Sequence, residues 1–288
     1  AMRSKNDVNS LAIFGGPPAF EEKLHVGRPS IPNRERLWAY VNEILDRRWL
    51  TNNGRCVQKL ERELAETLGV KHCIVTCNGT VALEIAIRAL GLTGEVIVPS
   101  WTFIATPQAL QWLGITPVFC DIDRGSQTID PQRVEERVTA RTTGIIGVHL
   151  WGRPCDVEGL ADVAQRRGLR LIYDAAHAFG CSHDGRLIGS FGDLEVFSFN
   201  ATKFFHTLEG GAVVTNNDDI AYTVRSMKYY GFGHDRELIG VGTNGKMHEV
   251  SAATGLVLLE DLDELIAVNR RHYMRYNEEL RGVPGVHL

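Results

Sequence analysis

Short apolar runs alternate with helical patterns from about residue 70 onward, and this alternation limits the chain to one class of fold. The runs are rich in Val and Ile and end at Gly, Pro or Asp, which is typical of buried strands; they span 72–77, 95–100, 116–122, 142–152 and 169–178. Segments 80–91, 105–114 and 156–168 lie between them, with apolar residues at helical spacing and a closing glycine. We therefore predict an α/β fold with a mostly parallel central sheet and helices on both faces.

Composition excludes several classes of function. The net charge of -4 over 288 residues gives no basic surface for nucleic acid, so we expect no nucleic-acid partner. No apolar segment approaches the roughly 20 residues that cross a bilayer, and no signal peptide is recognisable, so we expect no membrane partner. The six cysteines contain no CxxC pair, which favours buried thiols in a reducing, cytoplasmic protein and predicts no metal site.

Polar and aromatic residues follow the predicted strands. Ligands of parallel sheets bind at the carboxyl ends of the strands, so these residues are candidates for a site. The turn "CNGT" opens a helix and offers the amides near Gly79 and Thr80 to an anion. The other candidates at strand ends are Trp101, Phe103, Asp174, His177, Ser198 and Lys203.

Each candidate alone has an ordinary structural explanation. The turn or the aspartate could cap a helix, the aromatic residues could belong to the core, and His177 could be a loop histidine. Together they supply an anion cradle, an aromatic face, a carboxylate and a lysine among apolar residues, which are the groups that pyridoxal phosphate requires. Burial of Lys203 would favour its neutral, nucleophilic amine. We therefore predict a pyridoxal phosphate site.

The segment "SFNATKFFHTLEGG" (198–211) resembles the S-F-x-x-x-K-x-x-x-x-x-E-G-G signature of the DegT/DnrJ/EryC1/StrS sugar aminotransferases. The resemblance extends from "LAIFGGPPAF" (11–20) through "CNGTVALEIAIRALG" (77–91) to "TNGKMHEVSAATGL" (243–256). It implies the fold-type I architecture of pyridoxal-phosphate-dependent transferases.

The resemblance also implies roles for four residues. Lys203 would form the Schiff base with the cofactor, and Asp174 would pair with its pyridine nitrogen. Phe103 would stack on the ring, and His177 would lie near the ring hydroxyl, although many members carry Gln at that position.

The remaining matched residues concern the phosphate and the assembly. Ser198 and the turn at Gly79 and Thr80 would hold the phosphate. Asn244 matches an asparagine that family members send to the phosphate of the neighbouring subunit, which implies a homodimer. We expect the Asn244 turn to lie far from the phosphate site of its own chain, because the helix over 218–231 carries the chain away from the sheet edge.

The implied reaction is ping-pong transamination. An amino acid, expected to be L-glutamate, would donate the amino group, and freed Lys203 would move a proton between substrate and cofactor. The acceptor would be a nucleotide-linked keto-deoxysugar, with the motif "FHTLEGG" favouring a dTDP-4-keto-6-deoxyhexose.

Three other functions match parts of the sequence less well. "GVGTNG" (240–245) matches the G-x-G-x-x-G dinucleotide pattern, but no strand-helix-strand unit surrounds it. A sugar-nucleotide-binding or regulatory protein without pyridoxal phosphate would not need Lys203 and Asp174. A pyridoxal-phosphate-dependent sugar dehydratase of the same family typically carries His where Lys203 stands.

We predict three regions along the chain. Residues 1–33 form an N-terminal segment, and residues 34–235 form the large cofactor-binding α/β domain. Residues 236–288 hold the interface turn and the helical start of a small C-terminal domain. Family members continue beyond this point, so the sequence predicts that this domain is truncated.

Overall fold

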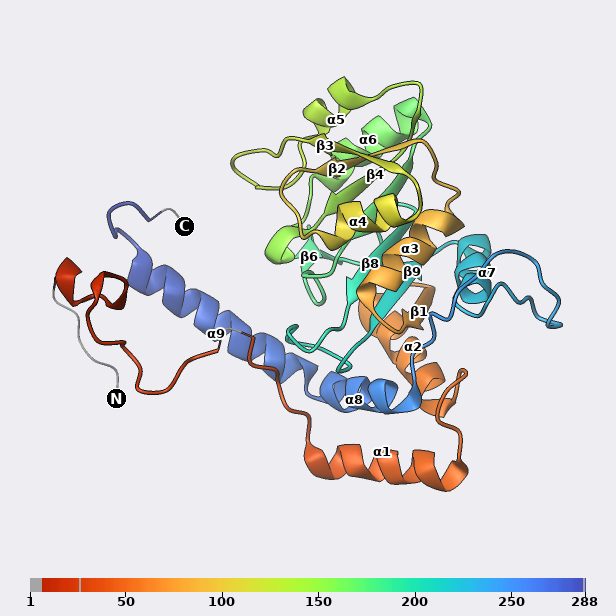
Figure 1. The fold of residues 1–288 in the computed structure, drawn as a ribbon, viewed down its shortest axis with the longest axis horizontal. Helices are drawn as coiled ribbons and strands as arrows, with labels where there is room; N and C mark the ends of the chain where they lie inside the picture. Colours follow the sequence, from red (N-terminus) through yellow and green to blue (C-terminus); the bar gives the residue numbers. More distant parts are fainter. Residues whose placement is uncertain (1–6, 26, 287) are drawn as a thin grey trace.

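A seven-stranded sheet forms the centre of the molecule (Figure 1). The computed structural model describes residues 7–25, 27–286 and 288. The strand order is β1-β9-β8-β5-β4-β2-β3, and only β9 runs antiparallel to its neighbours. The strands are β1 (His72–Thr76), β2 (Glu95–Pro99), β3 (Thr116–Cys120), β4 (Thr142–Val148), β5 (Arg170–Asp174), β8 (Leu194–Ser198) and β9 (Gly211–Thr215). The short strands β6 (Ser182–His183) and β7 (Arg186–Leu187) form a separate hairpin. The predicted mostly parallel sheet is confirmed.

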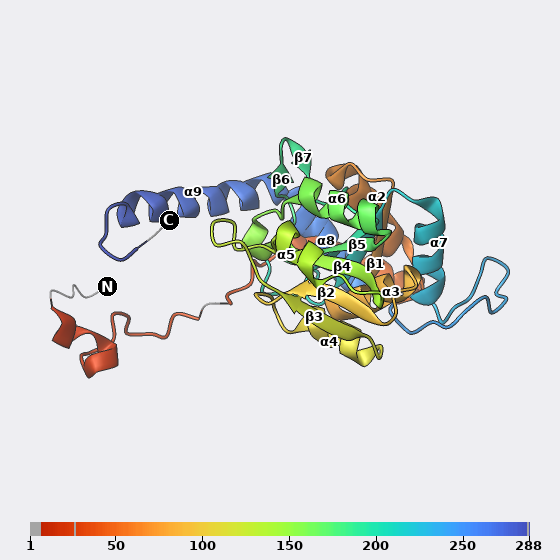
Figure 2. The ribbon, with the colours of Figure 1, turned by 90° about the horizontal axis from the view of Figure 1, so that it is seen from above.

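Helices cover both faces of this sheet (Figure 2). The first seven are α1 (Arg34–Arg47), α2 (Arg55–Leu68), α3 (Gly79–Ala89), α4 (Ala105–Trp112), α5 (Pro131–Arg137), α6 (Val157–Arg167) and α7 (Asp218–Met227). Alternate strand residues face opposite layers: Ile74 packs in the core with α3 and α7, whereas Cys73 and Val75 pack in the core with α2. The strand runs and helical segments predicted from the sequence are therefore confirmed as elements.

The strand β3 differs from the prediction in its burial. It was expected to be a buried strand, but it lies at the edge of the sheet and pairs only with β2. Its residue Phe119 is 51 % exposed. Apolar content alone does not distinguish an edge strand from a central one, because that depends on which strands pair.

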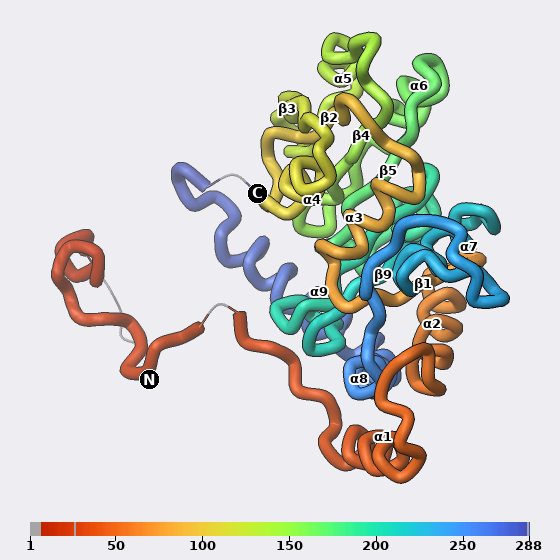
Figure 3. The backbone as a smooth tube through the Cα atoms, turned by 45° about the vertical axis from the view of Figure 1, so that its right-hand side comes forward, coloured from red at the N-terminus to blue at the C-terminus, as the bar shows by residue number. Residues whose placement is uncertain are grey.

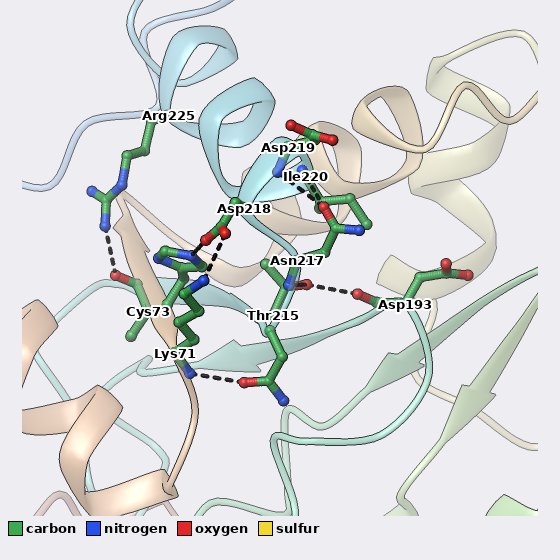
Figure 4. A network of polar contacts seen from close by, with 11 residues as sticks. Lys71, Cys73, Asp193, Thr215, Asn217, Asp218, Asp219, Ile220 and Arg225 are labelled. Carbon is green, nitrogen blue, oxygen red and sulfur yellow. Dashed lines mark hydrogen bonds and ion pairs between the residues drawn. The ribbon is translucent and has the colours of Figure 1, made fainter.

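Polar contacts hold α7 against the edge strand β1 (Figure 4). Asp218 accepts hydrogen bonds from Lys71 Nζ and His72 Nε2, each at 2.6 Å. Asn217 caps the helix by accepting from the amides of Asp219 and Ile220. Near the other end of α7, Arg225 donates to the carbonyl of Cys73. These contacts fix the position from which the chain continues into residues 228–247.

The last two helices have different environments. Helix α8 (Glu249–Glu260) packs against α1 and α2, and Ala252, Ala253 and Leu256 lie in the same core as α2. Helix α9 (Leu262–Leu280) extends away from the sheet, and only Leu262 of this helix is buried (Figure 1). The division of the chain at residues 33 and 235 stays a prediction.

Within the described ranges, no helix is both long enough and apolar enough to cross a membrane.

Candidate active site

A cavity of about 760 Å³ lies at the carboxyl ends of β1, β4, β5 and β8. Seven of the eight residues to which the resemblance assigns a role line it: Gly79, Thr80, Phe103, Asp174, His177, Ser198 and Lys203. The eighth, Asn244, does not line it. Trp101, the further candidate at a strand end, does not line it either. Residues up to 124 positions apart in the sequence thus meet because parallel strands end at one edge of the sheet.

The amino terminus of α3 forms one wall of this cavity. Asn78 caps the helix, and its Oδ1 accepts a hydrogen bond from the amide of Val81 at 2.8 Å. In the described part of the chain, the amides of Gly79 and Thr80 have no hydrogen-bond partner. Amides at a helix amino terminus attract an anion, so this wall can hold a phosphate group.

Ser198 lies directly opposite the same turn. A Cβ atom added to Gly79 would lie 3.0 Å from Ser198 Cβ and 3.2 Å from its Oγ. Gly211 is similarly constrained, because an added Cβ would lie 2.7 Å from the nitrogen of Gly79. Both glycines therefore allow the turn and the serine hydroxyl to approach one another closely, which brings amides and a hydroxyl together in one wall of the cavity.

Asp174 presents a buried carboxylate to the cavity. It is the last residue of β5 and is 6 % exposed. Its Oδ2 accepts from Thr106 Oγ1 at 2.8 Å, and its Oδ1 accepts from the amide of Ala176 at 3.1 Å. The hydroxyl of Thr106 also lies 2.9 Å from that of Thr102. These donors fix the carboxylate's orientation, so it can pair with a protonated ring nitrogen in the cavity.

Lys203 lies on a loop between β8 and β9 whose ends are joined. The amide of Phe199 donates to the carbonyl of Gly210 at 2.8 Å, and Asn200 Nδ2 donates to Glu209 Oε1 at 2.6 Å. Burial lowers the pKa of Lys203 below its usual value, although the negative charge of Asp174 opposes this shift. The neutral, nucleophilic amine is therefore more available than in an exposed lysine.

His177 is held in one orientation, and its neutral ring in one tautomer. The amide of Trp151 donates to His177 Nδ1 at 3.3 Å, so the proton of the neutral ring is on Nε2. Burial lowers the pKa of His177, and the positive charge of Lys203 lowers it further. His177 can therefore donate a hydrogen bond from Nε2 to a ligand. Trp151 itself has a left-handed backbone with φ of 52°, which is uncommon for a residue other than glycine.

Phe103 lies at the mouth of the cavity, and its side chain is 69 % exposed. Trp101 from the same loop and Trp151 also carry exposed rings, which meet edge to face at a centroid distance of 6.0 Å. Of these three aromatic residues, Phe103 lines the cavity, whereas Trp101 and Trp151 are not part of its lining.

Asn244 reaches a different position from the one expected. The chain after α7 runs back past β1 to α8 (Figure 3). The amide of Cys77 donates to the carbonyl of Gly245 at 2.9 Å, only two residues from the turn at Gly79. The expectation that this turn lies far from its own phosphate site is therefore wrong. The Asn244 side chain is nevertheless exposed and outside its own cavity.

Three functional contacts were missed from the sequence. Asn78 could have been recognised, because asparagine before a helix is a preferred cap. Neither the Thr106 hydrogen bond to Asp174 nor the Trp151 amide that fixes His177 leaves a local sequence signal, since both join residues that are distant in the chain.

Comparisons with known proteins agree with this geometry. A model described as the DegT/DnrJ/EryC1/StrS aminotransferase family matches residues 32–288. The dTDP-4-amino-4,6-dideoxy-D-glucose transaminase of Shigella dysenteriae is 41 % identical over 268 residues, which are 93 % of this chain and 73 % of that protein. A crystal structure of DesI in the presence of its TDP-sugar product is 49 % identical, with a TM-score of 0.93 over 98 % of this chain and 72 % of that one. The structure of NtdA from Bacillus subtilis with bound cofactor PMP is 31 % identical, with a TM-score of 0.78 over 87 % of this chain and 58 % of that one.

Proposed function

The chain belongs to the DegT/DnrJ/EryC1/StrS aminotransferase family, and we propose that its cavity binds pyridoxal phosphate and transfers an amino group from an amino acid to a nucleotide-linked keto-sugar. One observation carries this proposal. A lysine of lowered pKa, a buried carboxylate, and an amide and hydroxyl cradle all line one cavity of about 760 Å³.

The cavity residues fit this cofactor. When bound, pyridoxal phosphate supplies an aldehyde that combines with amines and a ring that accepts electrons from the substrate carbon. The Gly79 and Thr80 amides and the Ser198 hydroxyl would hold its phosphate.

Two further residues would orient the ring. Asp174 would keep the ring nitrogen protonated through its fixed negative charge, and His177 would donate from Nε2 to the ring hydroxyl. Phe103 would cover one face of the ring.

Lys203 would carry the covalent attachment and the proton. Its lowered pKa lets the neutral amine attack at a pH where an exposed lysine is still charged. The amino-acid substrate would displace this amine from the cofactor. The freed amine would then accept a proton from the substrate carbon and pass it to the cofactor.

The acceptor is proposed from the relatives. The Shigella dysenteriae protein is named for an amino group at C4 of a dTDP-linked dideoxyglucose, and the DesI structure is described with a TDP-sugar product. We therefore favour a dTDP-4-keto-6-deoxyhexose as acceptor and L-glutamate as donor.

The functional unit is proposed to be a homodimer. Asn244 is exposed and lies outside its own cavity, so it is free to reach the phosphate of a neighbouring subunit. Exposed rings at Trp101, Phe103 and Trp151 would be covered in such an assembly. A stable interface of this kind buries upward of about 2,000 Å².

Subunit mixing tests the shared site. A Lys203→Ala chain and an Asn244→Asp chain should each be inactive, the second because its added charge repels phosphate. After subunit exchange, one site of a mixed dimer carries both changes and the other carries neither, so activity should reappear. Proven exchange without recovered activity would mean that Asn244 does not serve a neighbouring subunit.

The activity itself is tested by incubating the protein with pyridoxal phosphate, glutamate and a panel of 3-keto and 4-keto nucleotide sugars. We expect 2-oxoglutarate and an amino sugar in equal amounts, with the dTDP-4-keto-6-deoxyhexose as best acceptor. A colourless protein that binds sugar nucleotides but not pyridoxal phosphate would favour the regulatory alternative instead. Loss of the sugar hydroxyl without glutamate consumption would favour the dehydratase.

A further inference from the structure

Asn200 is the centre of the turn that carries Lys203. Its carbonyl accepts from the amide of Lys203 at 2.9 Å, and its Oδ1 accepts from the amide and the hydroxyl of Thr202 at 3.0 and 2.8 Å. An asparagine side chain that bonds to the backbone two residues later stabilises a tight turn. The position of Lys203 therefore depends on the orientation of the Asn200 side chain.

Glu209 fixes that orientation from the other end of the loop. Asn200 Nδ2 donates to Glu209 Oε1 at 2.6 Å, so the side-chain amide of Asn200 joins Thr202 on one side to Glu209 on the other. A hydrogen bond to an ionised acceptor is stronger than one between neutral groups. Asn200 and Glu209 both line the large cavity, so the bond closes the Lys203 loop at the cavity wall.

The backbone around Glu209 has little freedom. The amide of Leu208 donates to His206 Nδ1 at 3.2 Å, and Thr207 Oγ1 donates to the carbonyl of Glu209 at 3.0 Å. Leu208 has a left-handed backbone with φ of 65°, which is uncommon for a residue other than glycine. A Cβ added to Gly210 would lie too close to Thr207 Oγ1 to fit. The carboxylate of Glu209 is thus presented by a segment that is held in one conformation.

The N-terminal segment anchors the same part of the loop. His206 is 1 % exposed, and because its Nδ1 accepts a hydrogen bond, the proton of its neutral ring is on Nε2. This Nε2 donates to the carbonyl of Ser30 at 2.7 Å. Strained backbone that surrounding contacts maintain is concentrated at functional sites. The left-handed Leu208, held next to a residue that lines the cavity, therefore indicates a role for this segment in the site.

We propose that Glu209 is a positioning residue for Lys203, because through Asn200 it holds the turn that presents the lysine amine to the aldehyde carbon of the cofactor. This inference rests on the proposed attachment of pyridoxal phosphate to Lys203. Ordering a lysine side chain costs conformational free energy when its amine reacts. A turn that is already fixed lowers this cost, because the backbone beneath the side chain does not also have to be ordered.

The test measures how well pyridoxal, which lacks the phosphate, attaches to Lys203 in the protein without cofactor. The neutral amine and the aldehyde form a C=N bond and release one water molecule. Borohydride reduction followed by mass spectrometry gives the fraction of Lys203 that is attached at each pyridoxal concentration. This readout depends on the amine and does not involve the phosphate cradle.

Two variants of Glu209 separate the hydrogen bond from the rest of the side chain. Glu209→Ala removes the acceptor and should weaken the attachment of pyridoxal about tenfold, as expected for the loss of a hydrogen bond to a charged group. Glu209→Gln keeps an oxygen that can accept from Asn200 Nδ2 and should remain within about threefold of the unchanged protein. Glu209→Met, which has a similar length but no such acceptor, replaces the Ala variant if that variant does not fold.

A double exchange tests whether Glu209 acts through Asn200. Asn200→Ala should weaken attachment at least as much as Glu209→Ala, since it also releases Thr202. Adding Glu209→Ala to Asn200→Ala should then change attachment no further, because the bond is already absent. Losses that multiply would show that Glu209 affects Lys203 by another route and would overturn the proposal.

Two controls exclude an effect on the phosphate cradle or on surface charge in general. In a Lys203→Ala protein, equilibrium dialysis measures pyridoxal phosphate held without the covalent bond, and adding Glu209→Ala should leave this affinity within about twofold. A larger loss would assign Glu209 to the cradle instead and overturn the proposal. Glu279→Ala removes an exposed carboxylate of α9 that accepts from Arg275 at 3.0 Å, and it should not change attachment.

The same measurements separate this inference from the proposed function. Pyridoxal phosphate must attach to Lys203 in the unchanged protein, and if it does not, the proposed function fails. If it does attach, and Glu209→Ala attaches pyridoxal as well as the unchanged protein, only the role of Glu209 has failed.

Discussion

The exchange Asp174→Asn separates the charge of the carboxylate from its shape. The structure indicates how the amide would fit. Its oxygen can accept from the amide of Ala176, as Oδ1 does at 3.1 Å. Its nitrogen can donate to Thr106 Oγ1, if the Thr106 hydroxyl proton turns toward Thr102 Oγ1 at 2.9 Å. Every polar group of this buried network then keeps a partner.

The expected magnitudes follow from this arrangement. Because no buried donor loses its acceptor, the free energy of unfolding should change by no more than about 1 kcal/mol. The charge that stabilises a protonated ring nitrogen is lost, and removal of such a contact costs about 3 to 4 kcal/mol in the transition state. The rate of the glutamate half-reaction should therefore fall by about 10² to 10³-fold.

Urea unfolding of the protein without cofactor measures the first quantity, and single-turnover absorbance changes with glutamate measure the second. The double variant Asp174→Asn with Thr106→Val is a sharp check, because the new amide nitrogen would have no acceptor. It should be about 1 to 3 kcal/mol less stable than the single Asp174→Asn variant. A single Asn variant with a near-normal rate, or one that unfolds easily, would refute this reasoning.

Three other predictions follow from the same geometry. Gly79→Ala should weaken pyridoxal phosphate binding at least tenfold, because its methyl would press on Ser198, whereas Gly240→Ala adds a methyl that meets nothing within 4 Å and should not; dialysis compares them. The rate at which Lys203 combines with pyridoxal should rise with pH around a midpoint below the usual lysine value of about 10.4, since burial lowers its pKa and the neutral amine reacts; a midpoint at the usual value would contradict the assigned burial. Lys228→Met leaves the buried Glu61 with Arg225 as its single cationic partner, beside the amide of Val75, and should cost about 3 kcal/mol of stability in urea, whereas Lys246→Met should cost less than about 1; equal losses would show that the buried ion pair stabilises the fold no more than the contacts of Lys246 with tyrosine rings.

Much of the fold could be predicted from the chain because its signals are local. The Val-rich and Ile-rich run at 72–77 and the glycine-terminated helix at 80–91 each follow from their own composition, and both appear as β1 and α3. The end of each strand can also be predicted from such a run. The residues that follow the strands could therefore be proposed as site residues, and seven of the eight with an assigned role line one cavity.

What was missed depends on contacts between distant segments. The exposure of Phe119 depends on β3 having one neighbour in the sheet. The return of Gly245 to Cys77 depends on how α7 docks against β1, which no residue of the turn itself specifies. Likewise, the hydrogen bond from Thr106 to Asp174 joins residues 68 positions apart.

The attachment of pyridoxal phosphate to Lys203 tests the central claim most directly. The protein is incubated with the cofactor, reduced with borohydride and digested, and mass spectrometry locates the added pyridoxyl group. The account predicts the label on the peptide that contains Lys203, and a Lys203→Ala protein that still binds some cofactor but carries no label there. A label found mainly on another lysine, such as Lys246, or no label despite cofactor binding, would contradict it.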